Sequence, residues 1–221
     1  DVRLLQGRDP EVPAGGPAGR GPGSLMRLAH GLAASLLILL ASCNPAPKEE
    51  FRGTDIGRES FGKRLDLVDH NGVRRGLDDF KGKVVVLFFG YVHCPDVCPT
   101  TLSDTAEAMR LLTPDEASRV QVLFVTVDPE RDTADLLKAY VPYFHERFLG
   151  LRGSDEETAQ AAREFRIFYR RHATPGSNGY NVDHTAGSYV LDARGRLRLL
   201  LPFAMSPDDM AHDLRILLRD G

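Results

Sequence analysis

The chain has 221 residues, of which 42% are hydrophobic and 27% are charged. This length and composition predict one globular domain with a buried core, flanked by extensions. The formal net charge of -3 comes from acidic and basic residues interspersed along the chain, with no basic stripe of the kind that binds nucleic acid. We therefore expect a small species or a protein as partner, and exclude nucleic acid.

The N-terminal part has the composition of processing segments. Residues 1–25 contain six glycines and four prolines and hardly any apolar cluster, so they cannot bury enough surface to offset the entropy of ordering. We expect them to be a disordered upstream extension outside the native protein, which would start at Met26. Residues 26–42 predict a lipoprotein signal peptide, since a short basic start precedes the apolar stretch Gly31–Leu40, which is too short to span a bilayer comfortably. An uncleaved N-terminal anchor helix is the alternative.

The signal ends at Leu40-Ala41-Ser42-Cys43, which resembles a bacterial lipobox, where the cysteine is lipidated and becomes the mature N-terminus. We expect Cys43 to anchor the protein to a membrane, and the polar, proline-bearing residues 43–60 to form a tether ahead of a domain over residues 61–221. A lipoprotein signal peptide and an uncleaved anchor helix would both place the domain in the bacterial cell envelope, in the periplasm or outside the cytoplasmic membrane. Which membrane holds the anchor stays open.

Strand and hairpin signals open the domain. The alternation in Arg64–Asp69, the turn signal Asn71-Gly72 and the segment Val73–Leu77 predict a β-hairpin. Lys83–Phe89 is rich in β-branched and aromatic residues, which predicts a buried central strand. Apolar residues then recur at helical spacing as far as Thr113-Pro114, where we expect the helix to end.

The second half of the chain continues the alternation and closes with a hairpin and a helix. We expect a buried strand over Val120–Val127, followed by a helix capped by Thr133, a short strand over Leu149–Gly153 and a helix that starts with a Ser154 and Glu157 capping box. An edge segment Ile167–Tyr169 and a polar loop from His172 to Asp183 come next. The chain closes with a hairpin of Ser188–Asp192 and Leu197–Leu201 and a last helix capped at Ser206. Asp128 and Asp132 should fix the turn and helix start after the second strand. The order predicts an α/β protein with a thioredoxin-like mixed central sheet, flanking helices and an N-terminal β-hairpin.

Two thiols lie where the first buried strand turns into a helix. Cys94 and Cys98 are four residues apart, a spacing that suits either a disulfide or the coordination of a soft metal. Cys98 is placed at a helix N-terminus, where unpaired N–H groups and the helix dipole favour a thiolate. With Cys43 taken by lipid, Cys94 and Cys98 remain as one pair in an oxidising compartment. A purely structural disulfide is the alternative, although so small a loop removes little entropy from the unfolded chain.

Four segments resemble those of the Sco/SenC family, in family order and spacing, and the similarity runs from about Phe61 to Leu218. They are Phe89-Gly90-Tyr91, the run His93–Leu102, the run Val127–Thr133, and Val182-Asp183-His184-Thr185. The resemblance implies a thioredoxin-like, membrane-tethered copper chaperone that helps to assemble the copper centre of cytochrome c oxidase. It also implies the metal ligands Cys94, Cys98 and His184.

The donor chemistry agrees with that implication. Two thiolates and one neutral imidazole form a soft, low-coordinate set that suits Cu(I) and that could hold Cu(II) with an added weak ligand. Zinc accepts the same donors but usually needs a fourth ligand. We expect His184 to reach the cysteines from the end of the 172–184 loop, with His172 as the nearest spare imidazole, and we assign no ligand role to His93.

Two function classes stay open from the sequence. The first is copper delivery to the copper-bearing subunit of cytochrome c oxidase, with other periplasmic copper chaperones or thioredoxin-like reductants as further partners and the lipid anchor as the membrane contact. The alternative is a thiol-disulfide oxidoreductase, in which Cys94 and Cys98 are a redox-active pair that reduces cysteines of an oxidase subunit. A peroxidase of the thioredoxin superfamily is a weaker third reading, because such proteins carry a different local motif.

Overall fold

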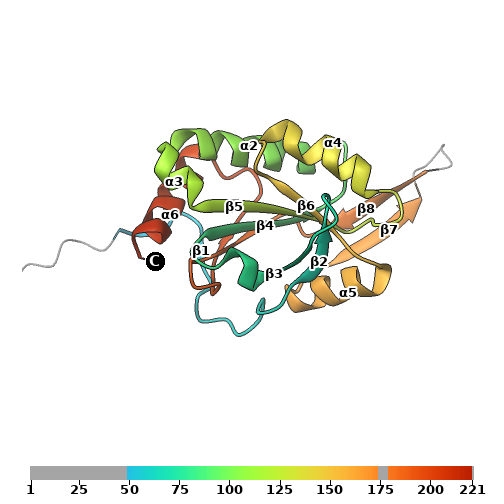
Figure 1. Cartoon of the computed structure of the whole chain (residues 1–221), viewed down its shortest axis with the longest axis horizontal. Helices are drawn as coiled ribbons and strands as arrows, with labels where there is room; N and C mark the ends of the chain where they lie inside the picture. The colour runs from blue at the N-terminus through green and yellow to red at the C-terminus, as the bar shows by residue number, and fades with distance from the viewer. Residues whose placement is uncertain (1–48, 174–178, 221) are drawn as a thin grey trace, which may run out of the picture. The chain divides into compact units, whose positions relative to one another are not determined.

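The computed structural model describes residues 49–173 and 179–220. Its centre is an eight-stranded mixed sheet with the strand order β1-β10-β9-β4-β5-β6-β2-β3 (Figure 1). The strands of this sheet are β1 (Thr54–Asp55), β2 (Asp66–Asp69), β3 (Arg74–Gly76), β4 (Val84–Gly90), β5 (Val120–Thr126), β6 (Leu149–Arg152), β9 (Ser188–Leu191) and β10 (Leu197–Leu201). A separate two-stranded sheet consists of β7 (Tyr169–Ala173) and β8 (Tyr180–His184).

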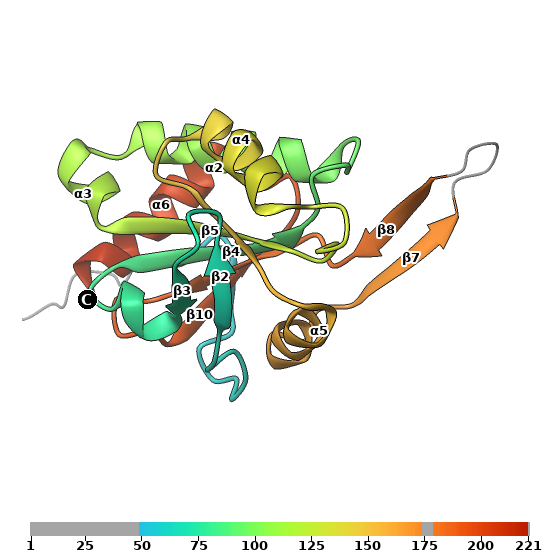
Figure 2. The same ribbon diagram turned by 45° about the vertical axis from the view of Figure 1, so that its right-hand side comes forward.

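Helices cover both faces of the main sheet. Helices α2, α4 and α6 lie on one face and α5 lies on the other (Figures 1 and 2). Helix α2 packs along α6. The helical elements are the 3₁₀ turn η1 (Leu77–Phe80) and the helices α2 (Val97–Leu111), α3 (Pro114–Ser118), α4 (Ala134–Phe144), α5 (Asp155–Glu164) and α6 (Pro207–Arg219).

The core lies around β4 and β5, which pair in parallel from Val84 opposite Val120 to Gly90 opposite Thr126. Every residue of these two strands is buried, as expected for parallel strands covered on both faces. Strand β6 continues the parallel arrangement beyond β5, whereas β9 runs antiparallel to β4. The predicted mixed α/β fold is confirmed, and β2 and β3 form the predicted N-terminal hairpin.

The sheet begins inside the segment predicted to be a tether. Strand β1 pairs with β10, and the backbone N–H groups of Arg52 and Gly53 each donate to the carboxylate of Asp213 at 2.8 Å. The Asp213 side chain is fully buried in α6. This long-range anchor places Thr54–Asp55 in the sheet, ahead of the expected domain start at residue 61, because a buried carboxylate stabilises backbone that has few apolar residues of its own.

The predicted extension, signal peptide and Cys43 lie outside the described residues. Within residues 49–173 and 179–220, no helix combines the length and the apolar character needed to cross a membrane.

A helix ends just before Thr113-Pro114, as predicted, but a second helix also starts at this dipeptide. Helix α2 ends at Leu111, and the same dipeptide opens the short helix α3. Thr113 is its N-cap, with Glu116 completing a capping box and Pro114 at a first-turn position. The residues that were expected to stop one helix therefore also cap the start of the next one.

The prediction of a polar loop from His172 to Asp183 is wrong at both ends. His172 lies in β7, and Asp183 lies in β8, which pairs antiparallel with β7 in a hairpin that projects from the body of the protein (Figure 2). His184 is the last residue of β8 and lies opposite Tyr169. The hairpin exposes charged residues rather than alternating apolar ones, so it lacks the sequence signal of a half-buried strand.

A buried carboxylate fixes the turn of the β2–β3 hairpin. Oδ1 of Asp69 accepts hydrogen bonds from the backbone N–H groups of Asn71 at 2.9 Å and Val73 at 3.0 Å, and Oδ2 accepts one from Arg75 Nε at 2.9 Å. Burial by itself raises the pKa of Asp69, but these hydrogen bonds outweigh it and hold the pKa below its ordinary value. The side chain is therefore ionised inside the fold.

Candidate metal and thiol site

The site begins where β4 ends. Gly90 is followed by a tight turn in which the N–H of Cys94 donates to the carbonyl oxygen of Tyr91 at 3.2 Å. Helix α2 then starts at Val97, so that Cys98 lies in its first turn and its backbone N–H donates to Sγ of Cys94 at 3.4 Å. Cys94 is half-buried, Cys98 is fully buried, and both are free thiols.

The imidazole of His184, which is 86 residues from Cys98 in the sequence, completes the group. Its Nε2 lies 3.4 Å from Sγ of Cys98, and its Nδ1 lies 3.0 Å from the carbonyl oxygen of Thr185. A carbonyl oxygen only accepts, so Nδ1 carries a proton, and Nε2 is the ring nitrogen that faces the sulfur pair. The ring packs edge-on against Phe88 and Tyr91, with centroid distances of 6.0 and 5.9 Å.

The three predicted donors therefore converge. Their ligand atoms, two sulfurs and one nitrogen, all lie within 4.8 Å of one another, and no other His, Cys, Asp or Glu of the described residues belongs to the group. For bonds of about 2.3 Å to sulfur and about 2.0 Å to nitrogen, two ligands of one metal ion in a tetrahedral or trigonal site lie roughly 3.5–4.0 Å apart. The group is close to the size that one ion would require.

The two thiols differ in acidity. The pKa of Cys94 falls to about 3, mainly because the Cys98 thiol donates to its sulfur, with backbone N–H groups of the helix start adding to the effect against burial. The same hydrogen bond and deep burial raise the pKa of Cys98. The resting pair is thus one thiolate on the accessible side and one thiol inside.

Asp132 stabilises the cysteine turn by accepting a backbone hydrogen bond from it. Its fully buried carboxylate oxygen Oδ2 accepts hydrogen bonds from the N–H of Val92 at 3.0 Å and from the hydroxyl of Thr126 at 2.6 Å. Its other oxygen, Oδ1, is buried without a hydrogen bond and lies 3.8 Å from Nδ1 of His93. Burial raises the pKa of Asp132. The expectation that this residue fixes a turn agrees with these contacts.

The other spare histidines lie apart from the donors. His93 is half-exposed and faces Asp132, and His172 faces Asp183 across the β7–β8 hairpin at 3.4 Å. Sequence reasoning missed a different set of residues, namely Arg131, Arg171 and Tyr180, which join the hairpin to the segment after β5. The run Glu130-Arg131-Asp132 was visible as a charge cluster, but nothing in the sequence indicated its partners.

These features define a class of protein. It is a thioredoxin-like α/β protein that carries a thiol pair and a remote imidazole at the carboxyl ends of parallel strands, where open α/β sheets place their sites. Residues 53–219 match the SCO1/SenC family model. This chain belongs to the SCO1/SenC family.

Individual relatives agree with that assignment. The chain is 38% identical over 168 residues to the mitochondrial protein SCO2 homolog of Bos taurus, covering 76% of this chain but only 62% of the bovine protein. The fold is similar to the structure of Bradyrhizobium japonicum ScoI with copper bound, with a TM-score of 0.65, 36% identity, and coverage of 71% of this chain and 98% of that one. It is also similar to the apo Sco1 protein from Thermus thermophilus, with a TM-score of 0.64, 40% identity, and coverage of 79% and 97%.

Proposed function

We propose that this chain is a membrane-tethered copper-binding protein that delivers copper to the copper-bearing subunit of cytochrome c oxidase. The observation that carries the proposal is the convergence of Cys94, Cys98 and His184, whose donor atoms lie within 4.8 Å of one another. The solved Bradyrhizobium relative with copper bound, at 36% identity, supports the choice of metal.

The donor set explains why copper would be preferred. Two sulfurs and one imidazole nitrogen suit Cu(I), which accepts few soft ligands, better than hard ions that require oxygen. Zinc would need a fourth ligand, and the described donor group holds three residues. Nδ1 of His184 already donates to a carbonyl oxygen, so Nε2 is the nitrogen turned toward the sulfurs, and Cys94 is already a thiolate. Of the two cysteines, only Cys98 has to lose a proton, so its coordination near neutral pH should release about one proton per ion.

Burial also indicates how copper would leave. Cys94 is the more exposed sulfur, whereas Cys98 is fully enclosed. An incoming thiolate of the receiving subunit would therefore reach the metal from the Cys94 side and replace that ligand first. Cys98 and His184 would hold the ion until the second exchange.

The direct test is a competition for Cu(I) between the reduced protein and a chelator. His184→Ala should bind Cu(I) much more weakly than the parent, because it removes the nitrogen donor. His172→Ala is the matched control, since it removes an imidazole from the same hairpin at a position outside the donor group. X-ray absorption of the loaded parent should report sulfur and nitrogen donors. Equal Cu(I) affinity of parent and His184→Ala would overturn the proposed site.

A thiol-disulfide oxidoreductase is the second candidate, and the unequal acidity of the two thiols favours it. The Cys94 thiolate would attack a partner disulfide, form a mixed disulfide and release one partner thiolate. Cys98 would then lose its proton, attack the Cys94 sulfur and release the second thiolate, leaving a Cys94–Cys98 disulfide for a thioredoxin-like reductant to reduce. Exchange needs no remote imidazole as ligand, so a His184→Ala variant that keeps reductase activity but loses copper would separate the two functions.

The membrane tether is a separate part of the proposal and depends on Cys43. Lipid attached to this residue would hold the domain in the periplasm or outside the cytoplasmic membrane, where other copper chaperones could supply it. Labelling with a fatty-acid analogue should modify the parent and not Cys43→Ser, and the variant should leave the membrane fraction. Equal membrane retention of both proteins would refute lipidation at this residue as the anchor.

A further inference from the structure

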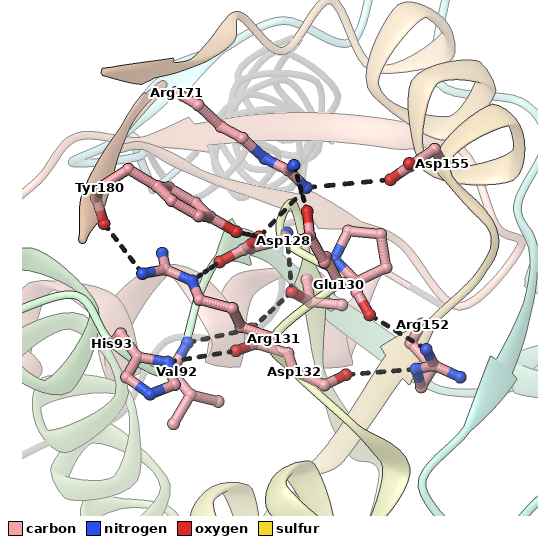
Figure 3. Close-up of polar contacts among 12 residues, drawn as sticks. Val92, His93, Asp128, Glu130, Arg131, Asp132, Arg152, Asp155, Arg171 and Tyr180 are labelled. Atoms are coloured by element: carbon pink, nitrogen blue, oxygen red, sulfur yellow. Dashed lines mark hydrogen bonds and ion pairs between the residues drawn. The ribbon is translucent and has the colours of Figure 1, made fainter. Parts of the chain in front are cut away.

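The segment Asp128–Asp132, which follows β5, contacts the two backbone segments that carry the donor group, namely the cysteine turn and the β7–β8 hairpin. Asp132 accepts from the N–H of Val92 and so holds the turn that carries Cys94. Asp128 points the other way, toward the hairpin that ends at His184 (Figure 3). The two carboxylates come from one short turn, so they fix the cysteine turn and the hairpin to the same piece of backbone.

Asp128 is the centre of a compact charge network. Its fully buried carboxylate accepts a hydrogen bond from the hydroxyl of Tyr180 at 2.7 Å and from Nε of Arg131, and it lies 3.2 Å from Nη2 of Arg171. Arg171 belongs to β7 and Tyr180 to β8. One carboxylate therefore contacts both strands of the hairpin.

Arg131 adds a second connection. Its Nη1 donates to the carbonyl oxygen of Tyr180 at 2.9 Å, and its guanidinium carbon lies 3.7 Å from the centre of the Tyr180 ring. The same guanidinium lies 5.7 Å from the centre of the Tyr91 ring, which packs against His184. This network of Asp128, Arg131, Arg171 and Tyr180, which we call the clamp, thus connects the start of β8 to the start of the cysteine turn.

The hairpin needs such a clamp. Among the residues that the structure describes, the β7–β8 sheet has two strands, and neither pairs with a strand of the main sheet. A two-stranded hairpin is marginally stable by itself in water. Because Tyr180 and His184 are the first and last residues of β8, fixing the former limits the positions that the latter can reach.

We propose that Asp128 is a positioning residue that holds the His184 imidazole within reach of the two sulfurs. This inference rests on the proposed copper function and extends it to the residues behind the ligands. Loss of the Asp128 charge weakens its contacts to Arg131, Arg171 and Tyr180 at the same time. The hairpin then samples positions in which Nε2 is too far from the cysteines to bind the same ion.

The first experiment compares Asp128→Asn with Glu130→Gln. Glu130 also accepts from Arg171, but on the exposed side of the network, which makes it a matched control. In chelator competition, Asp128→Asn should lower the Cu(I) affinity by about 10- to 100-fold, the usual effect of losing an outer-shell partner. Glu130→Gln should stay within about twofold of the parent. Equal affinities of the two variants would overturn the inference.

A double-mutant cycle tests whether Asp128 acts through His184. Once His184→Ala has removed the imidazole, adding Asp128→Asn should cause no loss beyond about twofold, because there is no ligand left to position. A further tenfold loss in the double variant would mean that Asp128 supports the fold or the cysteines instead. Tyr180→Phe, which removes only one hydroxyl, is the milder variant if Asp128→Asn fails to fold, and it should weaken Cu(I) binding in the same direction.

A measurement without metal separates this inference from the proposed function. In NMR spectra of the reduced apo protein, Asp128→Asn or Tyr180→Phe should shift or broaden the His184 imidazole signals, and Glu130→Gln should leave them in place. Unchanged imidazole signals in both clamp variants would overturn the inference even if copper binds as proposed. Failure of the parent to bind Cu(I) through sulfur and nitrogen would refute the proposed function, while the apo spectra would still decide whether the clamp positions His184.

Discussion

Gly90 offers a sharp test of how the cysteine site is packed. It is the last residue of β4, and a methyl group on its Cα would lie 2.6 Å from Sγ of Cys98, 2.9 Å from Phe124 and 3.0 Å from Phe88. Non-bonded heavy atoms prefer separations of about 3.5–4.0 Å, so the sulfur would have to move by about 1 Å. All three neighbours are at most 1% exposed, and they have no free space to move into.

Gly90→Ala should therefore destabilise the reduced apo protein by about 1–3 kcal/mol, the usual cost of overpacking a core. For domains of about 150–250 residues this corresponds to a decrease in Tm of roughly 2–12 °C. Because the displaced atom is a proposed ligand, Cu(I) affinity should also fall, by about tenfold or more. Thermal unfolding followed by circular dichroism and chelator competition measure the two effects.

Gly76→Ala is the matched control. Its added methyl would meet only the carbonyl oxygen of Leu65, at 3.3 Å, and its backbone φ of -114° is open to any residue. We expect a change in unfolding free energy within about 0.5 kcal/mol and unchanged copper binding. If Gly90→Ala behaved like Gly76→Ala in both assays, Cys98 would not be held against β4 in the way described.

Three further predictions concern the anchoring of β1, the turn between β2 and β3, and the acidity of Cys94. Asp213→Ala removes the acceptor of two backbone N–H groups, so hydrogen exchange at Gly53 should accelerate by about tenfold or more, and unchanged exchange would contradict the anchoring of β1. The pKa of Asp69 is lowered from its ordinary value of 3.8, so its ionised form stabilises the fold above that value, and this stabilisation is lost as the pH falls through the folded-state pKa. The difference in unfolding free energy between the parent and Asp69→Asn should therefore shrink from about pH 7 to about pH 3; a constant difference would refute the assignment. Finally, alkylation of Cys94, with its pKa of about 3, should proceed at a nearly constant rate between about pH 5 and about pH 8, whereas an ordinary thiol reacts about tenfold faster per pH unit. Mass spectrometry should place the first adduct on Cys94, and a first adduct on Cys98 would contradict the assigned acidities.

Local patterns were sufficient for most of the secondary structure and for two of the three donors of the site. Continuous apolar runs identify β4 and β5, because strands covered on both faces need no polar residues. The capping box of Ser154 and Glu157 identifies the start of α5, because both partners lie within one turn of chain. The cysteine pair was also predictable from local sequence, since two cysteines four positions apart at a strand-to-helix turn have their sulfurs close together.

The remaining parts depend on contacts between distant residues. His184 is 86 residues from Cys98, and its approach depends on the pairing of β8 with β7 and on the clamp at Asp128. Backbone hydrogen bonds pair strands without regard to side-chain identity, so an exposed, charged hairpin leaves no periodic pattern in the sequence. The buried partners of Asp128 and Asp213 are likewise set by the packing of whole elements. Residue types and their spacing along the chain therefore establish which groups are able to do the chemistry, whereas the packing of distant elements selects the ones that meet.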